Sequence, residues 1–441
     1  MNQAAETQLL SQERVQQLKS WLERRASEIL AQNGSGKNAG ERIQAALLQA
    51  LEESRAGLQE PEKHALLEGL MREMLGYGAI QPLLDDPTVT EVMINGVRDV
   101  YIEREGKIEV TKISLGDDEK VMQLAQKIVL PLGKNVDADN PTVDARLPDG
   151  SRVNVVVPPI ALDGTIITIR KFASKKLKAE DLVQFGSMTE AMAEYLRACV
   201  LARLNILISG GTGSGKTTLL NVLSGFIPRH ERIVTIEDSA ELKLHQDHVV
   251  RLEGRPPNVE GLGEVTIRHL VRNSLRMRPE RIIVGEVRGG EALDMLQAMN
   301  TGHDGSLTTL HANSPRDAIA RLETLVLMAG LELPLQAIRK QVASAVDLIV
   351  HQSRISDGSR KITSIAEVVG MEGEVVTLSE VFRFEQTGID AEGKVVGSLV
   401  PTGIRSMFDK KLEAAGFKLG AHIFSTFAQQ EKREVGRRGR R

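Results

Sequence analysis

The chain has 441 residues, 41% of them hydrophobic, a length that predicts roughly two to four domains with a sizeable core. A formal net charge of −3 argues against a chain that is basic throughout, and the single cysteine, Cys199, excludes an intrachain disulfide and fits a reducing compartment. No stretch reaches about 18 consecutive apolar residues, and the N-terminus lacks a basic-then-apolar signal pattern. We therefore expect a cytoplasmic protein that reaches a membrane only through a partner.

Residues 1–75 are predicted to form a helical region. An amphipathic helix is expected over 4–31, because apolar residues recur there on one helical face. Asn33–Gly36 breaks this pattern, and two further helical patterns follow at 41–56 and 62–75.

Residues 76–172 have the pattern of a small α+β domain with an antiparallel sheet. Short alternating segments are separated by Asn-Gly, Glu-Gly and Asp-Gly turns. The expected elements are strands at 89–94, 100–102, 108–110, 153–157 and 166–169 and a helix near 117–131. The segment 173–186, together with Lys171 and Phe172 before it, is rich in lysine, and we interpret it as a linker and hinge.

A short apolar run, Asn205–Ser209, leads into a glycine-rich loop and then into a helical pattern. Gly210–Thr217 fits G-x-x-x-x-G-K-[ST] at every fixed position. The glycines let backbone N–H groups point at phosphate oxygens, while Lys216 should reach the β- and γ-phosphates and Thr217 should hold Mg²⁺. The expected nucleotide-binding residues are Gly210, Gly211, Thr212, Gly213, Ser214, Gly215, Lys216, Thr217 and Thr218.

The region 187–355 alternates between helical and strand patterns. A capping-box start at Ser187–Glu190 opens a helix that should end near Leu204. Apolar strands are expected at 205–209, 233–236, 282–285 and 306–310. This alternation predicts an α/β motor domain with a mostly parallel sheet covered on both faces. Residues 356–441 predict a β-rich appendage and then a basic tail.

Two strand ends in this region carry carboxylates. The strand Arg281–Gly285 is followed by Glu286, and we expect that strand beside the P-loop strand, where the carboxylate would hold Mg²⁺ or its waters. The other strand end carries Glu237, Asp238 and Glu241, and a carboxylate there is well placed to position the water that attacks the γ-phosphate. A solvated acidic loop is the alternative interpretation.

Two histidines flank the strand pattern at 306–310. His303 precedes it and His311 follows it. A zinc site is not indicated, because no cysteine is near and the spacing suits no structural zinc site. A lone histidine is commonly structural, but a hydrogen-bonding sensor of the γ-phosphate suits this position better.

The order of these motifs resembles that of the ATPases of type II and type IV secretion systems and of type IV pili. Their Walker A, Asp box, Walker B and His box correspond here to segments around Lys216, Glu241, Glu286 and the two histidines. Gly285–Arg288 and Thr309–Asn313 are specific to that family rather than to P-loop proteins in general.

The upstream segments extend the resemblance toward one branch. Tyr77–Leu84, Arg146–Asn154 and Thr168–Phe172 look most like the CpaF branch, the motors of tight-adherence pili. Ser239-Ala240 departs from the many pilus motors that have proline after the aspartate, and this departure bears on the branch more than on the chemistry.

The resemblance implies a RecA-like motor domain in a homohexameric ring that uses ATP and Mg²⁺. It implies that Glu241 is the catalytic carboxylate and that Glu286 and Thr217 organise the metal shell, Glu286 through water. His303 and His311 would then sense the γ-phosphate.

Arg152 and Arg170 match arginine positions of the family. A guanidinium can meet a phosphate with two parallel N–H bonds, and arginine fingers contribute on the order of 10³–10⁵ in rate. The resemblance therefore implies that these two residues clamp the γ-phosphate, and we expect the clamp to act within one chain.

These observations predict a hexameric, Mg²⁺-dependent ATPase that powers assembly, and by extension retraction, of a type IV or tight-adherence pilus through an inner-membrane platform protein. It would be cytoplasmic and peripheral at that membrane. A conjugation or effector-secretion ATPase is the first alternative. A nucleic-acid ring motor is the second, although the charge and the few aromatic residues argue against nucleic acid as a partner. A structural ring without hydrolysis is the third.

Overall fold

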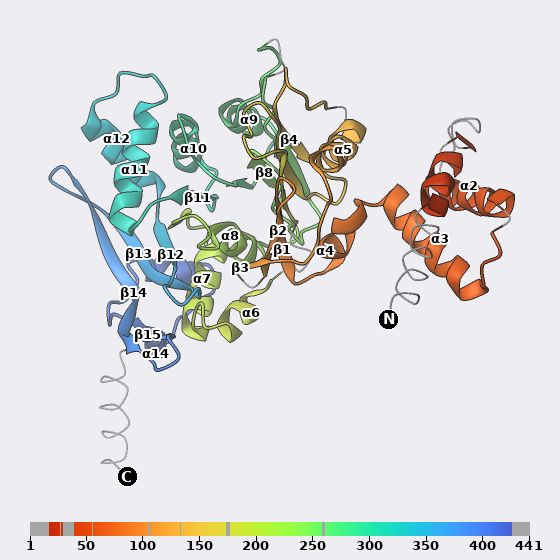
Figure 1. The fold of residues 1–441 in the computed structure, drawn as a ribbon. Coiled ribbons are helices and arrows are strands. Elements are labelled where there is room, and N and C mark those ends of the chain that lie inside the picture. The colour runs from red at the N-terminus through yellow and green to blue at the C-terminus, as the bar shows by residue number, and fades with distance from the viewer. Residues whose placement is uncertain are drawn as a thin grey trace. The chain divides into compact units, whose positions relative to one another are not determined.

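The computed structural model describes residues 17–26, 28–29, 39–54, 56–104, 106–132, 134–172, 177–257 and 261–425 (Figure 1). The chain divides into two compact units, Met1–Ser174 and Lys175–Arg441. Of the helix expected over 4–31, helical backbone is described at 17–26 and 28–29, and the rest lies outside the described residues. The expected basic tail also lies outside them.

The first unit begins with a small helical cluster. The helices α2 (Ala39–Ser54) and α3 (Glu60–Leu75) confirm the two expected patterns, each beginning two residues earlier. Buried Leu22, Leu47 and Leu70 pack in one cluster, which explains why apolar residues recur on one face of each segment.

The first unit continues with a six-stranded antiparallel sheet in the order β3-β2-β1-β6-β5-β4. Between Gly78 and Asp85 a 3₁₀ turn and the short helix α4 (Gln81–Asp85) lead into it. The elements are β1 (Val89–Asn95), β2 (Asp99–Arg104), β3 (Lys107–Val110), α5 (Asp118–Val129), β4 (Thr142–Arg146), β5 (Arg152–Val156) and β6 (Ile166–Arg170). The edge strand β4 was not predicted, since its sequence TVDAR has few apolar residues.

The second unit is built on a nine-stranded sheet in the order β15-β14-β13-β12-β7-β11-β10-β8-β9. Its strands are β7 (Ile206–Gly210), β8 (Ile233–Glu237), β9 (Val249–Glu253), β10 (Arg281–Val284), β11 (Leu307–His311), β12 (Leu348–Arg354), β13 (Arg360–Glu372), β14 (Val375–Ile389) and β15 (Val395–Pro401). Strands β7 to β12 pair in parallel, and β13 to β15 add to β12 in antiparallel fashion.

Helices cover both faces of the parallel part (Figure 1). One face packs on α7 (Glu190–Leu201) and α8 (Lys216–Ser224), and the other on α9 (Ile267–Ser274), α10 (Glu291–Asn300), α11 (Pro315–Leu327) and α12 (Leu335–Ala345). The C-terminal helices α13 (Asp409–Ala414) and α14 (Ala421–Phe424) join the first of these cores. The strands read as continuous apolar runs because both faces are buried.

The α/β fold class with a small α+β domain before it is confirmed, and three expectations of the sequence are corrected. The segment 173–186 includes a helix, α6 (Ala179–Gln184), which buries Leu182. Strand β10 does not lie beside the P-loop strand β7, because β11 is inserted between them. Residues 360–401 extend the main sheet instead of forming a separate appendage. Among the described residues, no helix combines the length and apolar character needed to span a membrane.

Candidate functional site

Four of the predicted segments meet at one edge of the second unit's sheet. Strands β7, β11, β10 and β8 run in parallel, so their carboxyl ends share that edge. Each strand is followed directly by a predicted motif: the P-loop, the end of the His box, Glu286 and the Glu237–Glu241 loop. Ligands of open α/β sheets bind at this edge.

The P-loop needs its glycines. Gly213 and Gly215 have φ angles of 69° and 95°, a region that favours glycine, and a Cβ on Gly210 would lie 2.1 Å from the carbonyl oxygen of Gln352. Helix α8 begins at Lys216 directly after the loop. Backbone N–H groups at such a helix start form a cradle that phosphate oxygens fit.

Lys216, His311 and Glu286 are in contact. Lys216 Nζ donates to the carbonyl oxygen of Gly211 at 2.9 Å and lies 3.3 Å from His311 Nε2, which lies 2.8 Å from Glu286 Oε1. Burial lowers the pKa of Lys216 despite the opposing charge of Glu286. Burial, followed by the charge of Lys216, also lowers the pKa of His311.

One nitrogen of His311 therefore faces two partners. In the neutral imidazole, which the lowered pKa favours, Nε2 either carries a hydrogen and donates to Glu286 or carries a lone pair and accepts from Lys216. It cannot do both at once. In this structure only the contact with Lys216 has hydrogen-bond geometry: Glu286 Oε1 lies close to His311 but has no hydrogen-bond partner among the described residues. A hydrogen bond from His311 to Glu286 would therefore need the Lys216 ammonium to move away.

Glu286 has the surroundings of a metal-shell carboxylate. Its side chain is 17% exposed, and Arg288 Nη2 lies 2.6 Å from Glu286 Oε2. Thr217, in the first turn of α8, supplies a hydroxyl. One carboxylate and one hydroxyl fit Mg²⁺, which keeps several waters and takes few protein ligands.

The Asp-box carboxylates differ in a way that the sequence does not reveal. Glu237 is buried, and its Oε2 accepts from the backbone N–H groups of Glu241 and Leu242 at 2.7 and 2.9 Å. Its Oε1 has no hydrogen-bond partner among the described residues, and burial raises the pKa of Glu237 against these two bonds. Glu237 thus holds the loop through these two hydrogen bonds. Glu241 is half-buried, and its charge helps to raise the pKa of Arg288.

The structure does not bring His303 to the P-loop of its own chain. His303 lies in the turn before β11, where the amino ends of the strands meet, and its carbonyl accepts from Ser306 Oγ at 2.8 Å. The five residues of β7 separate this edge from the P-loop, roughly 15 Å at about 3.3 Å per residue. The two histidines of the expected sensor therefore lie at opposite edges.

Arg152 and Arg170 lie in the first unit. They are directly opposite each other on the antiparallel strands β5 and β6. Arg170 is exposed and its other neighbour across the sheet is Glu91. The structure therefore brings the two predicted finger residues together with each other.

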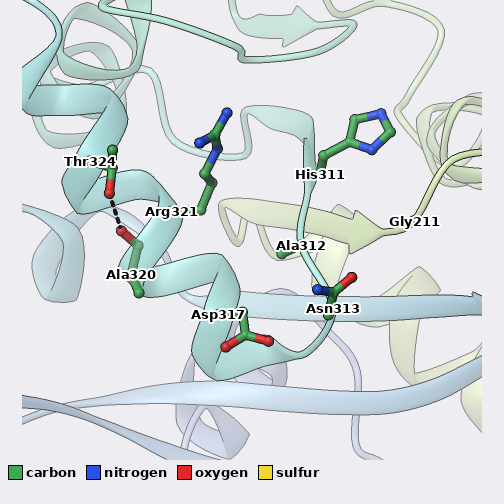
Figure 2. A pocket seen from close by; sticks show the side chains of 8 residues that line it. All are labelled: Gly211, His311, Ala312, Asn313, Asp317, Ala320, Arg321 and Thr324. Atoms are coloured by element: carbon green, nitrogen blue, oxygen red, sulfur yellow. Dashed lines mark hydrogen bonds between the residues drawn. The ribbon is translucent and has the colours of Figure 1, made fainter.

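A pocket of about 480 Å³ adjoins the P-loop on the side of α11. Figure 2 shows His311 and Asn313 at its rim and Asp317 and Arg321 on the helix that faces them. Sequence reasoning missed these α11 residues, although the spacing of Asp317 and Arg321 puts them on one helix face directly after the His box. The lining residues are Gly211, His311, Ala312, Asn313, Asp317, Ala320, Arg321 and Thr324.

Comparisons with known proteins place this site in a family. The family model described as "Type II/IV secretion system protein" matches residues 73–379. A "Putative conjugal transfer protein" of Mycobacterium tuberculosis is 39% identical over 324 residues, which cover 72% of this chain and 92% of that protein. The type IV secretion system protein VirB11 of Brucella suis is 35% identical over 308 residues, with coverages of 64% and 85%.

A solved structure shares the fold. The ATPase DotB of Yersinia pseudotuberculosis matches with a TM-score of 0.50 at 16% identity, over 68% of this chain and 79% of that one. The family match spans the P-loop, Glu241, Glu286 and both histidines. On this evidence, the chain belongs to the family of type II/IV secretion system proteins.

Proposed function

We propose that this chain hydrolyses ATP with Mg²⁺ and converts the reaction into motion that drives a secretion or conjugation machine. The observation that carries this proposal is the contact between Lys216, His311 and Glu286 beside the P-loop. A lysine ammonium, an imidazole and a carboxylate at the N-terminus of a helix form an electrostatic arrangement that suits phosphoryl transfer.

Each side chain has a role in this proposal. The P-loop N–H groups and Lys216 bind the phosphates, while Thr217 and Glu286 hold Mg²⁺ and its waters. Bound Mg²⁺ would neutralise phosphate charge. Glu241 orients the attacking water, and the buried Glu237 fixes the loop that carries Glu241.

His311 acts as the sensor. When Lys216 turns toward a γ-phosphate, His311 Nε2 loses one of its two partners and is left to donate to Glu286. Loss of the phosphate returns the ammonium to His311. His303 has no part in its own chain's site.

Arg152 and Arg170 supply finger residues in this proposal. Their direct pairing on β5 and β6 supports a joint role, since a phosphate relieves the repulsion between neighbouring guanidinium groups. Arg170→Ala should lower turnover by at least about a hundredfold, and ATP should still bind. A hundredfold loss lies just below the range of about 10³–10⁵ in rate that arginine fingers contribute. Activity in rings mixed from Arg170→Ala and Glu241→Gln subunits would overturn action within one chain.

We infer that the machine is a type IV secretion or conjugation system, because the relatives above are named for conjugal transfer and type IV secretion. The tight-adherence pilus motor is the second candidate, supported by Tyr77–Leu84 and Arg146–Asn154. In either case the chain would work as a homohexamer, peripheral at the inner membrane through a partner.

Two measurements test this function. The purified chain should hydrolyse ATP only with Mg²⁺, and a chain that binds no nucleotide would overturn the enzymatic proposal. Crosslinking in source cells should then capture a membrane component of a conjugation channel. Capture of a pilus platform protein instead would reject conjugation and support the second candidate.

A further inference from the structure

A hairpin far from the P-loop in sequence lies against it. Arg360, the first residue of β13, donates from Nε to the carbonyl oxygen of Gly213 at 2.9 Å, across 147 residues of sequence. A Cβ on Gly215 would lie 3.2 Å from Arg360 Cδ and 3.2 Å from Gln352 Nε2. The end of β12 and the start of β13 therefore pack directly on the outside of the loop.

The bond from Arg360 fixes the direction of one peptide group. In a trans peptide the carbonyl oxygen and the next N–H point in opposite directions, so the Gly213 oxygen that faces Arg360 turns the Ser214 N–H the other way. That N–H points at the carbonyl oxygen of Gly211, 3.4 Å from the nitrogen, to which Lys216 Nζ also donates. The Ser214 N–H thus faces the same interior as the Lys216 ammonium.

The Gly213–Ser214 peptide needs a restraint from outside the P-loop. Glycine rotates between conformations at little steric cost, and the peptide follows Gly213. A flip would turn a carbonyl oxygen toward the phosphates and replace attraction by repulsion. Among the described residues, Arg360 is the side chain that donates to the Gly213 oxygen.

The hairpin also concentrates positive charge at the loop. Arg354 and Arg360 are directly opposite each other in the β12–β13 register, and Arg354 Nη1 lies 3.8 Å from the position of a Cβ on Gly213. Gln352 between them and the loop is buried, and its Oε1 has no hydrogen-bond partner in the described part of the chain.

We propose that Arg360 is a positioning residue of the nucleotide site: it holds the Gly213–Ser214 peptide so that the Ser214 N–H faces the phosphates. The inference rests on the proposed function and adds to it a residue outside the known motifs. Arg360 acts on ground-state binding of the phosphates, because the peptide is oriented before the reaction begins. Its loss should therefore raise KM and leave kcat largely intact.

The test compares Arg360→Ala, Arg360→Lys and Arg383→Ala in the full chain. Arg383 is also an exposed strand arginine, but it pairs with Glu385 on β14, away from the loop. Fluorescent mant-ADP, displaced by ADP or pyrophosphate, measures phosphate binding, and steady-state ATPase gives KM and kcat.

Arg360→Ala should weaken ADP and pyrophosphate binding about tenfold, raise KM by a similar factor and change kcat less than about twofold. Arg360→Lys should recover part of the affinity, because an ammonium can still donate to the Gly213 oxygen. Arg383→Ala should behave as wild type.

Unchanged ADP affinity in Arg360→Ala would overturn the proposal. So would a fall in kcat that tracks a lower melting temperature, since that pattern means general destabilisation. If Arg360→Ala does not fold, Arg360→Met decides, because it keeps the length of the side chain and removes the donor: about tenfold weaker ADP binding in a folded Arg360→Met supports the bond to Gly213, and unchanged affinity overturns it. Failure of wild type to bind mant-ADP would instead overturn the proposed function.

Discussion

The two edges of the second unit's sheet use their polar and charged groups differently. At the amino edge, buried Arg281 lies 2.6 Å from Glu231 and donates to the carbonyl oxygen of Gly305 at 3.1 Å. Asn205 there accepts from the N–H groups of Gly305 and Ser306 and donates to the carbonyl oxygen of Ala345. These buried polar groups have partners, as expected of a stabilising network.

The carboxyl edge leaves its polar groups in competition. His311 Nε2 lies close to both Lys216 and Glu286 and is hydrogen-bonded to Lys216, and the Oε1 atoms of Glu237 and Glu286 have no hydrogen-bond partner among the described residues. Burial lowers the pKa of Lys216. At the amino edge burial acts to raise the pKa of Glu231, but the hydrogen bonds and charges of Arg281 and Arg203 together outweigh it, and the pKa of Glu231 falls. The competition around Lys216, His311 and Glu237 therefore marks the edge that carries the P-loop. The Arg281 and Asn205 networks hold the amino edge, where among the described residues the buried Nδ1 of His303 has no hydrogen-bond partner.

Lys216→Ala should have the largest effect and should sharpen this contrast. We expect no measurable ATP turnover and weaker nucleotide binding, because the main cation facing the phosphates is lost. Stability should not fall, since the ammonium is partly desolvated and no carboxylate of the described residues forms an ion pair with it. Steady-state ATPase and thermal melting measure both, with exposed Lys410→Ala as control. A large drop in melting temperature would break the contrast.

Glu241→Gln should lower turnover by at least about a hundredfold, the low end for a lost general base, while ATP still binds. Glu237→Gln is its matched control, because the amide oxygen can still accept from the N–H groups of Glu241 and Leu242. Single-turnover hydrolysis and nucleotide binding compare the two variants. If Glu237→Gln loses turnover and Glu241→Gln keeps it, the catalytic assignment moves to the buried carboxylate.

Arg281→Met should act on stability alone. Breaking a buried ion pair costs about 3–5 kcal/mol, and the loss here should lie at or below the low end of that range, because Arg203 Nη2 remains 3.2 Å from Glu231 Oε1. Turnover per folded molecule should stay near wild type. Denaturant unfolding measures the loss. The double variant Arg281→Met with Glu231→Leu should recover part of it, because no buried charge is left unpaired. A specific loss of turnover in the folded single variant would show that the amino edge also serves catalysis.

The smallest expected effect concerns pH. Burial lowers the pKa of His311 in the folded chain below its usual value near 6.5, with Lys216, Arg288 and Arg321 acting in the same direction and Glu286 against them. The unfolded chain therefore binds more protons just below pH 6.5, so stability should fall as the pH drops through that range. Melting at pH 5.5 and 7.5 should show a smaller acid loss in His311→Gln than in wild type. An equal fall in melting temperature in wild type and His311→Gln would contradict a role for His311 in this pH dependence.

Local patterns were sufficient for the P-loop and for most elements, although not for the edge strand β4 or the helix α6. The strand, glycines and helix of the P-loop are neighbours in sequence, so their geometry follows from short-range preferences. The insertion of β11 between β7 and β10 could not be predicted, because strand order is set by packing between distant segments.

The roles of individual side chains depended on burial and direction. Glu237 and Glu241 are equivalent in sequence, and only the structure shows that the first bonds the loop of the second. His303 and His311 are eight residues apart in one motif, yet they lie at opposite edges of the sheet because strand β11 runs between them. Arg360 shows no motif at all, because its contact with Gly213 spans 147 residues.

The antiparallel strands β13, β14 and β15 extend the sheet of the second unit well beyond the P-loop strand. From β7 through β12, β13 and β14 to β15, each strand is hydrogen-bonded to the next, and β15 lies four strand spacings from the P-loop strand, roughly 19 Å. A ladder of this kind resists bending along its hydrogen bonds, so a small rotation of β7 moves β15 along an arc. For a given rotation, the displacement of a strand grows with its distance from β7. A rotation of a few degrees at the P-loop strand therefore displaces β15 by about an ångström.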